Sequence, residues 1–499
     1  MNDEPDLDLA AEDLDRPDLD PGDWPAFRAL GHRMLDEMID HLETVRDRPA
    51  WQPVPASARA RLGTALPAKG TPLATLYGDF RETILPFPTG NAHPRFFGWV
   101  HGSGTPTGML AELLAAGINA NLGGRAHAPI LVERQVIGWC RELFQFPDST
   151  AGLLVTGTSF ANLLAIAVAR TDRLGAAVRR SGLRDGPRLT AYAARSAHGC
   201  VTKAFELLGL GSDSLRLVPT DREFRIDMTA LRQAILADRA AGAVPFLVIG
   251  TAGTVDTGAI DDLASLADLA AAEDLWLHVD GAFGALAMLS PTLKGRLAGI
   301  ERADSLAFDF HKWAHVPYDA ACVLVREGDL MRATFATEPP YLARYERGAG
   351  AGAPWFADYG IDLSRGFRAL KVWFTLREQG SDKLGAAILK NCRQAEALGH
   401  AIARASELEL MAPVSLNIVC FRHRGLPEAK LDALNKAIVV ALQESGVAVP
   451  SSTLIDGKLA IRVNLTNHRT TGADLRIFLE AVRAEGARLA PQMAGEAQA

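Results

Sequence analysis

The chain has 499 residues, of which 48% are hydrophobic and 22% charged, and its formal net charge is −7. A chain of this length exceeds what one compact core usually holds, so we expect more than one structural unit with a sizeable interior. Since 59 acidic residues outnumber 52 basic ones, the composition excludes a basic surface for phosphate backbones, and we expect no nucleic-acid partner.

The cysteine spacing and the hydropathy bear on the location of the protein. The cysteines lie far apart, at Cys140, Cys200, Cys322, Cys392 and Cys420. They lack the short spacings of a disulfide framework or a zinc site, which fits a reducing compartment. No run of about 18 apolar residues occurs, so we expect no membrane span. The N-terminus lacks the basic start and apolar stretch of a secretory signal. A cytoplasmic location follows by elimination.

The N-terminal part divides into an acidic tail and a helical segment. Residues 1–23 carry ten acidic groups and one base, a composition that predicts a disordered tail. Apolar residues then recur at steps of three and four over residues 24–48, which predicts a helix, and a second short helix is expected near 71–83. We assign residues 24–95 to this N-terminal helical segment.

From about residue 96 to 375, short β-rich runs alternate with alanine-rich helical runs. The strands are expected at 153–156, 188–194, 245–251, 275–280 and 305–310, and helices at 159–170, 228–241 and 263–273. This alternation predicts an α/β domain with a large parallel sheet, where ligands bind beyond the carboxyl ends of the strands. Residues 376–499 are expected to form a small C-terminal α/β domain, with helices at 384–404 and 428–445 and strands near 417–421 and 460–464.

Three stretches of chemically active residues follow predicted strands. In Asp309-Phe310-His311-Lys312-Trp313 a lysine stands at a strand end, where its amine could form a Schiff base with a carbonyl. Asp280 ends another strand, where its carboxylate could pair with a protonated pyridine nitrogen. In Thr156–Asn162, Gly157 permits a tight turn, and the next two residues offer hydroxyl and N–H groups at a helix start that favours a phosphate.

The order of these three stretches resembles that of the pyridoxal 5'-phosphate (PLP) enzymes of fold type I, which have the aspartate-aminotransferase fold. Together with His278-Val279-Asp280, they identify the chain as similar to the group II amino-acid decarboxylases, the family of aromatic-L-amino-acid decarboxylase and glutamate decarboxylase. The resemblance extends from about Phe27 to Phe478. Stretches such as His93–Gly98, Thr251–Thr254 and Phe367–Phe374 agree with it.

The resemblance implies a role for particular residues. Lys312 corresponds to the lysine that binds PLP covalently, Asp280 to the partner of its pyridine nitrogen and Ala282 to the small residue beside the ring. The implied phosphate contacts are Thr158 and Ser159, with Asp309 nearby. Three further residues match catalytic positions of the family: His198, which stacks on the cofactor ring, His311, which precedes the lysine, and Tyr341, which lies on a mobile loop (338–355) and is the candidate proton donor.

The substrate remains the open question at this level. PLP-dependent decarboxylation of an L-amino acid to its amine and CO2 is the implied reaction, and an aromatic substrate is the first hypothesis. The candidate substrate contacts are Trp99, His101 and Asn121. The chain departs from the family at Gly123, where a bulky aromatic residue is common, and at Phe160, where the family often has glutamate.

Other functions stay open beside this one. The asparagine-rich segment 119–125 favours a decarboxylase of a polar or acidic amino acid, and oxidative deamination to an aldehyde is an alternative that Tyr341 opposes. A PLP-binding scaffold without turnover is a hypothesis of a different class. His311 and His315 lack an acidic neighbour at zinc spacing, so no metal site is predicted. The resemblance also implies a homodimer with active sites at its interface.

Overall fold

The computed structural model describes residues 19–337, 342 and 344–495. The predicted acidic tail lies mostly outside these residues. The helices are α1 (Trp24–Glu43), α2 (Ala56–Leu62), α3 (Leu73–Thr83), α4 (Pro106–Ile118), α5 (Ala128–Leu143), α6 (Thr158–Leu174), α7 (Val178–Ser181), α8 (Cys200–Leu207), α9 (Met228–Ala240), α10 (Leu263–Ala272), α11 (Phe310–Trp313), α12 (Gly328–Phe335), α13 (Arg368–Arg404), α14 (Glu428–Glu444) and α15 (Gly472–Gly495).

The chain forms two compact units. The first combines the described part of Met1–Val45 with Val54–Pro86, and contains α1, α2 and α3. The second combines Arg46–Pro53 with Phe87–Ala499 as far as it is described, and holds every strand: β1 (Ala151–Val155), β2 (Leu189–Ala194), β3 (Leu215–Val218), β4 (Val244–Thr251), β5 (Trp276–Asp280), β6 (Ser305–Asp309), β7 (Ala321–Val325), β8 (Leu408–Leu410), β9 (Ile418–His423), β10 (Ser451–Ile455) and β11 (Lys458–Asn464).

Among the described residues, seven strands of the second unit form one sheet, the large sheet, in the order β1-β7-β6-β5-β4-β2-β3. The pairs from β6 to β3 are parallel, whereas β7 runs antiparallel to both of its neighbours, β1 and β6. Most strands are buried along their whole length, as expected where helices cover both faces. The predicted α/β fold with a large, mostly parallel sheet is confirmed.

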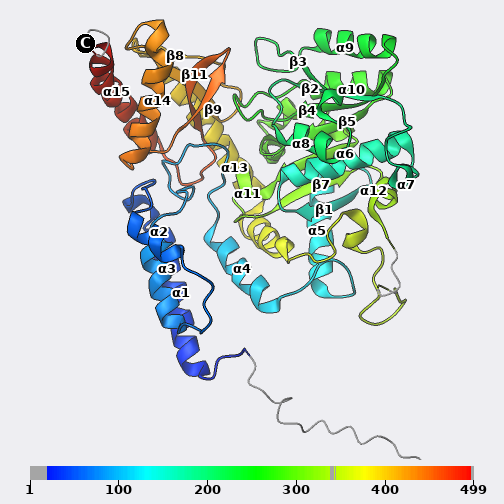
Figure 1. Ribbon diagram of the computed structural model, residues 1–499, viewed down its shortest axis with the longest axis horizontal. Coiled ribbons are helices and arrows are strands. Elements are labelled where there is room, and N and C mark those ends of the chain that lie inside the picture. Colours follow the sequence, from blue (N-terminus) through cyan, green and yellow to red (C-terminus); the bar gives the residue numbers. More distant parts are fainter. Residues whose placement is uncertain (1–18, 338–341, 343, 496–499) are drawn as a thin grey trace, which may run out of the picture. The chain divides into compact units, whose positions relative to one another are not determined.

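Helices cover the two faces of the large sheet (Figure 1). Side chains alternate along β5, so His278 and Asp280 leave the same face, and both bond to Asn162 of α6. Gly250 of β4 faces the other side, where an added Cβ would lie 2.9 Å from leucines of α10. Helix α6 therefore covers the face that carries Asp280, and α10 packs closely on the opposite face because Gly250 has no side chain.

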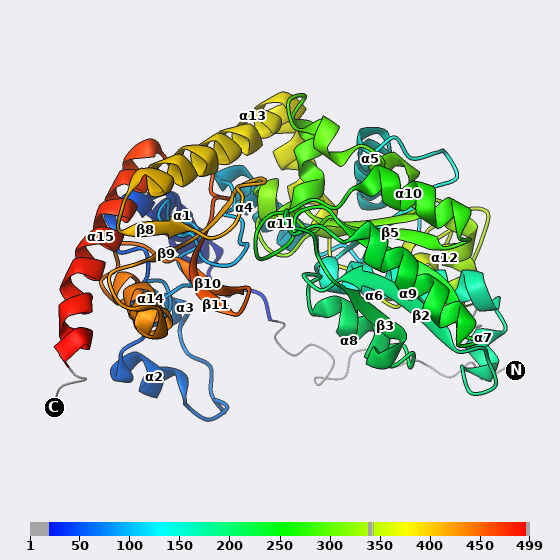
Figure 2. The same ribbon diagram turned by 90° about the horizontal axis from the view of Figure 1, so that it is seen from above.

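The small sheet has the order β10-β11-β9-β8, and its strands are antiparallel to one another. Helices α14 and α15 pack together and bury an apolar cluster against it that includes Phe97, Phe421 and Phe478. Helix α13 extends from the large sheet to the small one (Figure 2), and Gly380 interrupts its helical backbone with a φ of +71°. The two sheets are thus linked by one long, interrupted helix.

Most elements predicted from sequence periodicity occur in the structure. The expected strands correspond to β1, β2, β4, β5, β6, β9 and β11, and the expected helices to α1, α3, α6, α9, α10, α13 and α14. Helix α13 begins sixteen residues earlier than predicted. No range was predicted for the remaining elements, which are β3, β7, β8, β10, α2, α4, α5, α7, α8, α11, α12 and α15. No helix in the described part of the chain is both long and apolar enough to cross a bilayer. The proposed boundary at residue 376 between large and small domains stays a prediction.

A buried ion pair holds the end of β1 in place. Arg365, which precedes α13, pairs with Glu133 of α5, and both side chains are at most 2% exposed. Arg365 also donates to the carbonyl groups of Leu122 and Leu154 at 2.9 and 2.7 Å, and Glu133 accepts from the Leu154 N–H at 3.1 Å. This cluster joins α5, β1 and the segment after α4.

Replacement of Arg365 by methionine should destabilise the protein by about 3–5 kcal/mol, because the Glu133 carboxylate would stay buried without its partner. Urea unfolding followed by circular dichroism measures this change. The control is Arg488→Met, which removes a pair whose arginine is 51% exposed and should cost less than about 1 kcal/mol. Equal effects of the two substitutions would contradict this account.

Candidate active site

A cavity of about 370 Å³ opens at the carboxyl-terminal edge of the large sheet. Its walls come from the segments that follow β1, β2, β4, β5 and β6 and from the segment before α4. The lining residues are Trp99, Val100, His101, Gly157, Thr158, Ser159, His198, Cys200, Thr251, Gly253, Val255, Asp280, Ala282, Phe283, Asp309, His311, Lys312 and Tyr318. This is the edge at which parallel α/β sheets bind ligands.

The structure brings ten of the twelve predicted site residues to this cavity. They are Trp99, His101, Thr158, Ser159, His198, Asp280, Ala282, Asp309, His311 and Lys312. Asn121 is not among the lining residues; its side-chain oxygen Oδ1 accepts from the backbone N–H groups of Gly123 and Arg365 at 2.9 and 3.0 Å, so here it fixes a loop. Tyr341 lies outside the described residues.

Lys312 and Asp309 form the charged centre of the cavity. Asp309 ends β6, and Lys312 lies on the single helical turn of α11 that follows. The lysine Nζ is 2.6 Å from Asp309 Oδ2, and the lysine side chain is 20% exposed. The other carboxylate oxygen of Asp309 accepts from the Thr158 N–H at 2.7 Å. Asp309 therefore joins the lysine to the first turn of α6.

The start of α6 offers donors for an anion. Gly157 precedes the helix in extended conformation and has no side chain to cap it, while Asp309 accepts from the first N–H, that of Thr158. The hydroxyl groups of Thr158 and Thr251 are buried and have no partner among the described residues, although both residues line the cavity. Since unpaired buried hydroxyls are costly, a bound group with acceptor oxygens would stabilise them, and a helix N-terminus favours negative charge. A phosphate group fits these donors.

Asp280 lies at the end of β5 with both carboxylate oxygens engaged. Oδ1 accepts from the Ala282 N–H at 3.1 Å, and Oδ2 accepts from the Asn162 side-chain amide at 2.9 Å. Burial raises the pKa of Asp280, while Asn162 and the positive charge of Lys312 act in the opposite direction. Asn162 was missed as a site residue in the sequence, where only its place in the turn-to-helix stretch singled it out.

Two histidines of the cavity each accept a backbone N–H at Nδ1. His198 Nδ1 accepts from the Cys200 N–H at 3.2 Å, so its hydrogen in the neutral ring is on Nε2. His311 Nδ1 accepts from the Ala320 N–H at 3.1 Å, and burial lowers the His311 pKa. Burial, with a smaller effect of Lys312, also lowers the pKa of His101. His101 and His311 are therefore neutral at physiological pH.

Tyr318 is a residue of the cavity that sequence reasoning did not find. Its ring lies 4.3 Å from the His311 ring and 6.0 Å from the His101 ring, measured between centroids. Burial, together with the charge of Asp309, raises the Tyr318 pKa to about 12, so the phenol stays protonated. Tyr318 lies in an irregular segment after α11, and no periodicity in the sequence indicates where its side chain points.

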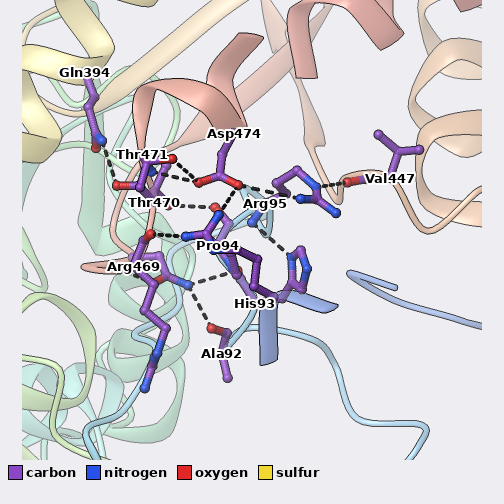
Figure 3. A network of polar contacts seen from close by, with 12 residues as sticks. Ala92, His93, Pro94, Arg95, Gln394, Val447, Arg469, Thr470, Thr471 and Asp474 are labelled. Atoms are coloured by element: carbon purple, nitrogen blue, oxygen red, sulfur yellow. Dashed lines mark hydrogen bonds and ion pairs between the residues drawn. The ribbon is translucent and has the colours of Figure 1, made fainter. Parts of the chain in front are cut away.

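The segment before α4 reaches the cavity because a polar network anchors it (Figure 3). Arg95 lies 3.6 Å from the buried carboxylate of Asp474 and donates to the Val447 carbonyl at 2.7 Å. The Thr470 hydroxyl donates to the Pro94 carbonyl at 2.7 Å. These contacts tie the His-Pro-Arg stretch to the loop after β11, to the start of α15 and to the segment between α14 and β10. The network thus fixes the chain just ahead of Trp99.

Trp99 itself has a strained backbone, with a φ of +47°. Arg462 of β11 donates to the Trp99 carbonyl at 2.9 Å, and the Trp99 N–H donates to the Ser451 hydroxyl at 3.3 Å. The Trp99 and His101 rings are stacked, with centroids 5.8 Å apart. Residues of the small sheet therefore hold an aromatic wall of the cavity in place.

Within the described residues, no group of three histidine, cysteine, aspartate or glutamate side chains is arranged to hold a metal ion. The charged groups at the centre of the cavity are paired with protein side chains: Lys312 with Asp309, and Asp280 with Asn162. The chemistry that this arrangement suits is that of an organic cofactor with a phosphate and a cationic ring.

Residues 55–424 match the pyridoxal-dependent decarboxylase conserved domain. An aromatic-L-amino-acid decarboxylase of Bacillus atrophaeus is 34% identical over 466 residues, which cover 92% of this chain and 95% of that protein. A phenylacetaldehyde synthase of Arabidopsis thaliana is 27% identical over 89% of this chain and 92% of its own length. Among solved structures, Oryza sativa TDC with PLP and tryptamine has a TM-score of 0.86 and 26% identity, covering 95% of this chain and all of that one.

Replacement of Lys312 by alanine should abolish covalent attachment of PLP, because Lys312 is the lysine among the cavity-lining residues. Borohydride reduction of the PLP-loaded protein, followed by peptide mass spectrometry, should find the added mass on the Lys312 peptide of the unaltered protein and no added mass in the Lys312→Ala protein. Lys294→Ala, which changes an exposed lysine, is the matched control and should keep the modification. A modification that persists on another lysine of the Lys312→Ala protein would refute the assignment.

Proposed function

Since this chain belongs to the pyridoxal-dependent decarboxylase family and is a PLP-dependent carboxy-lyase, we propose that it converts an aromatic L-amino acid to its amine and CO2. The observation that carries the proposal is that ten predicted site residues line one cavity. They come from segments far apart in the chain, since Trp99 and Lys312 are separated by 213 positions. The aromatic-L-amino-acid decarboxylase relative supports the substrate class.

The residues of the cavity fit PLP. The unpartnered hydroxyls of Thr158 and Thr251 and the start of α6 suit its phosphate, and Asp280 suits its pyridine nitrogen. When bound, PLP supplies a cationic ring that accepts the electron pair left when CO2 departs. The buried carboxylate of Asp280 would keep the ring nitrogen protonated, and Lys312 would hold the cofactor covalently.

Proton transfer requires a donor that reaches the substrate carbon after CO2 has left. His198 has its Nε2 hydrogen available and lines the cavity, so we assign it a supporting role in that transfer. The donor proposed from the resemblance is Tyr341. Tyr318 lines the cavity as a protonated phenol. We assign His311 to packing against Tyr318, since their rings are 4.3 Å apart.

The aromatic wall supports a planar substrate side chain. Trp99, His101 and Tyr318 present ring faces or edges to one another at centroid distances of 5.8 and 6.0 Å. The same wall carries polar atoms, since each of its three rings has a hydrogen-bonding group, which keeps a polar or acidic substrate as the alternative. The phenylacetaldehyde synthase relative keeps aldehyde formation as a second alternative.

A product panel tests the proposed reaction. The PLP-loaded protein should form tryptamine, tyramine, phenethylamine or dopamine from the corresponding L-amino acid, with release of CO2, and should form no amine from glutamate or aspartate. Mass spectrometry of the products distinguishes the three alternatives. An aldehyde with ammonia in place of the amine would favour the synthase reaction, and an amine from glutamate or another polar amino acid alone would overturn the aromatic assignment.

The quaternary structure is proposed to be a homodimer. Helix α4 carries four leucine and isoleucine side chains, spaced three, one and four residues apart, that are between 39% and 58% exposed: Leu110, Leu113, Leu114 and Ile118. Leu131 of α5 adds to them at 62% exposure. An apolar helix face of this kind is typical of a subunit interface, and the family resemblance supports a second copy as the occupant. Asn121 follows α4 and stays a candidate substrate contact.

Sedimentation equilibrium at micromolar concentration should give twice the mass of the chain. The double substitution Leu113→Lys/Leu114→Lys should shift the protein to the monomer, because two charges would then be buried at the interface. Leu236→Lys, on α9 and 63% exposed, is the control and should leave the dimer intact. A monomeric unaltered protein would contradict the proposed dimer.

We propose a cytoplasmic location from the state of the cysteines. The five cysteines of the chain are all buried and unpaired. Buried thiols without disulfide partners are compatible with a reducing compartment, which supports this location.

A further inference from the structure

A chain of buried hydrogen bonds lies behind Asp280, on the side away from the cavity. Trp276, His278 and Asp280 alternate along β5 and face α6 on one side of the large sheet. Ser305 of β6 is paired directly with His278, and Asn162 of α6 lies above them. Asn162, His278 and Ser305 are fully buried, and neither Asn162 nor His278 is among the described residues that line the cavity.

Four hydrogen bonds connect these residues in order. Trp276 Nε1 lies 2.8 Å from Ser305 Oγ, and Ser305 Oγ lies 2.8 Å from His278 Nδ1. His278 Nε2 is 2.9 Å from Asn162 Oδ1, and Asn162 Nδ2 is 2.9 Å from Asp280 Oδ2. The chain therefore ends on the carboxylate that faces the cavity.

The chemistry of the end groups fixes the direction of the hydrogen bonds. An ionised carboxylate can only accept, so Asn162 directs its amide N–H at Asp280, with its second amide hydrogen toward Cys200 Sγ at 3.4 Å, and presents Oδ1 to His278. The His278 hydrogen therefore lies on Nε2 and is donated to Asn162 Oδ1, so Nδ1 accepts from the Ser305 hydroxyl, which in turn accepts from the Trp276 N–H. Burial lowers the His278 pKa to about 3, so the ring is neutral and carries one hydrogen, as this order requires.

A chain directed this way stabilises the ionised form of Asp280. The Asn162 amide is a donor to a charged acceptor, and it opposes the effect of burial on the Asp280 pKa. The amide cannot rotate to present its oxygen to the carboxylate, because His278 donates to that oxygen. Hydrogen bonds in such a chain polarise one another in the same direction.

We propose that Asn162 and His278 are positioning residues of the active site: His278 fixes the orientation of the Asn162 amide, and Asn162 holds the Asp280 carboxylate ionised and in one orientation toward the pyridine nitrogen of PLP. The proposal rests on the proposed function, in which Asp280 pairs with that nitrogen. Ser305 and Trp276 set the tautomer of His278 and complete the chain.

The test uses the PLP-loaded protein and two readouts besides activity. The first is the dissociation constant of PLP, and the second is the ¹⁵N resonance of PLP labelled at the ring nitrogen, which differs between the protonated and unprotonated ring. Asn162→Leu keeps a similar volume and removes the amide. It should weaken PLP binding about 10- to 100-fold, as expected for loss of a hydrogen bond to a charged group, and move the resonance toward the unprotonated ring.

Two substitutions of His278 separate positioning from packing. Gln at position 278 can still donate to Asn162 Oδ1, so His278→Gln should keep the resonance and most of the affinity. His278→Phe keeps a ring without the donor and should behave like Asn162→Leu, and its effect should disappear in the Asn162→Leu background, because the two residues act in series. If Asn162→Leu does not fold, the comparison of His278→Gln with His278→Phe decides the proposal.

Controls distinguish the failure of this proposal from that of the proposed function. Thr171→Val removes a buried hydroxyl bond within the same helix, far along α6 from the site, and should change neither readout. Asp280→Ala should change both. If Asp280→Ala changes both readouts while Asn162→Leu and His278→Phe change neither, the positioning role is overturned and the role of Asp280 stands. If Asp280→Ala changes neither, the assigned partner of the ring nitrogen is wrong, and the positioning role falls with it.

Discussion

The site depends on the two contacts of one buried carboxylate, that of Asp309. One oxygen lies 2.6 Å from Lys312 Nζ and the other accepts from the Thr158 N–H at 2.7 Å. A carboxylate buried to this extent is stable only where both oxygens are paired, so the end of β6, the turn of α11 and the start of α6 are held in one arrangement. Helix α6 then runs across the large sheet in the position that brings Asn162 behind Asp280.

The charges of the cavity are few, and each has a defined partner. Asp280 and Asp309 are the carboxylates of the lining and Lys312 is its primary amine, while burial lowers the pKa values of His101 and His311 and so keeps these rings neutral. A neutral imidazole can donate or accept a hydrogen bond without adding a charge that would compete for the cofactor. The cavity therefore offers one anion for a cationic ring, one amine and donors for a phosphate.

The small sheet contributes to the same cavity through Arg462 of β11. This guanidinium is buried and donates to the carbonyl groups of Trp99 and Val255 at 2.9 and 2.8 Å. Both acceptors belong to residues that line the cavity. Because a buried cation needs all of its donors satisfied, a displacement of the small sheet would leave Arg462 unpaired, and the aromatic wall is thereby coupled to the position of that sheet.

The sequence alone determined the class of the fold, while the cofactor and the candidate site residues followed from the resemblance of its motifs to the decarboxylase family, and ten of those residues lie at one cavity. The reason is that hydrophobic period, strand-end position and motif order are local properties. Lys312, Asp280 and Thr158 each lie at or just after the end of a strand of five residues. Only the tertiary structure decided which side chains stand beside them. Tyr318 follows a helical turn with no periodic signal, and Asn162 and His278, 116 residues apart, meet because α6 crosses β5. Asn121 is a residue whose place the sequence could not fix. Its predicted role at the substrate depends on where its amide points, and in this structure the amide oxygen bonds to the N–H groups of Gly123 and Arg365. Side-chain direction over such distances is set by the packing of helices on a sheet, which the spacing of residues along the chain does not encode.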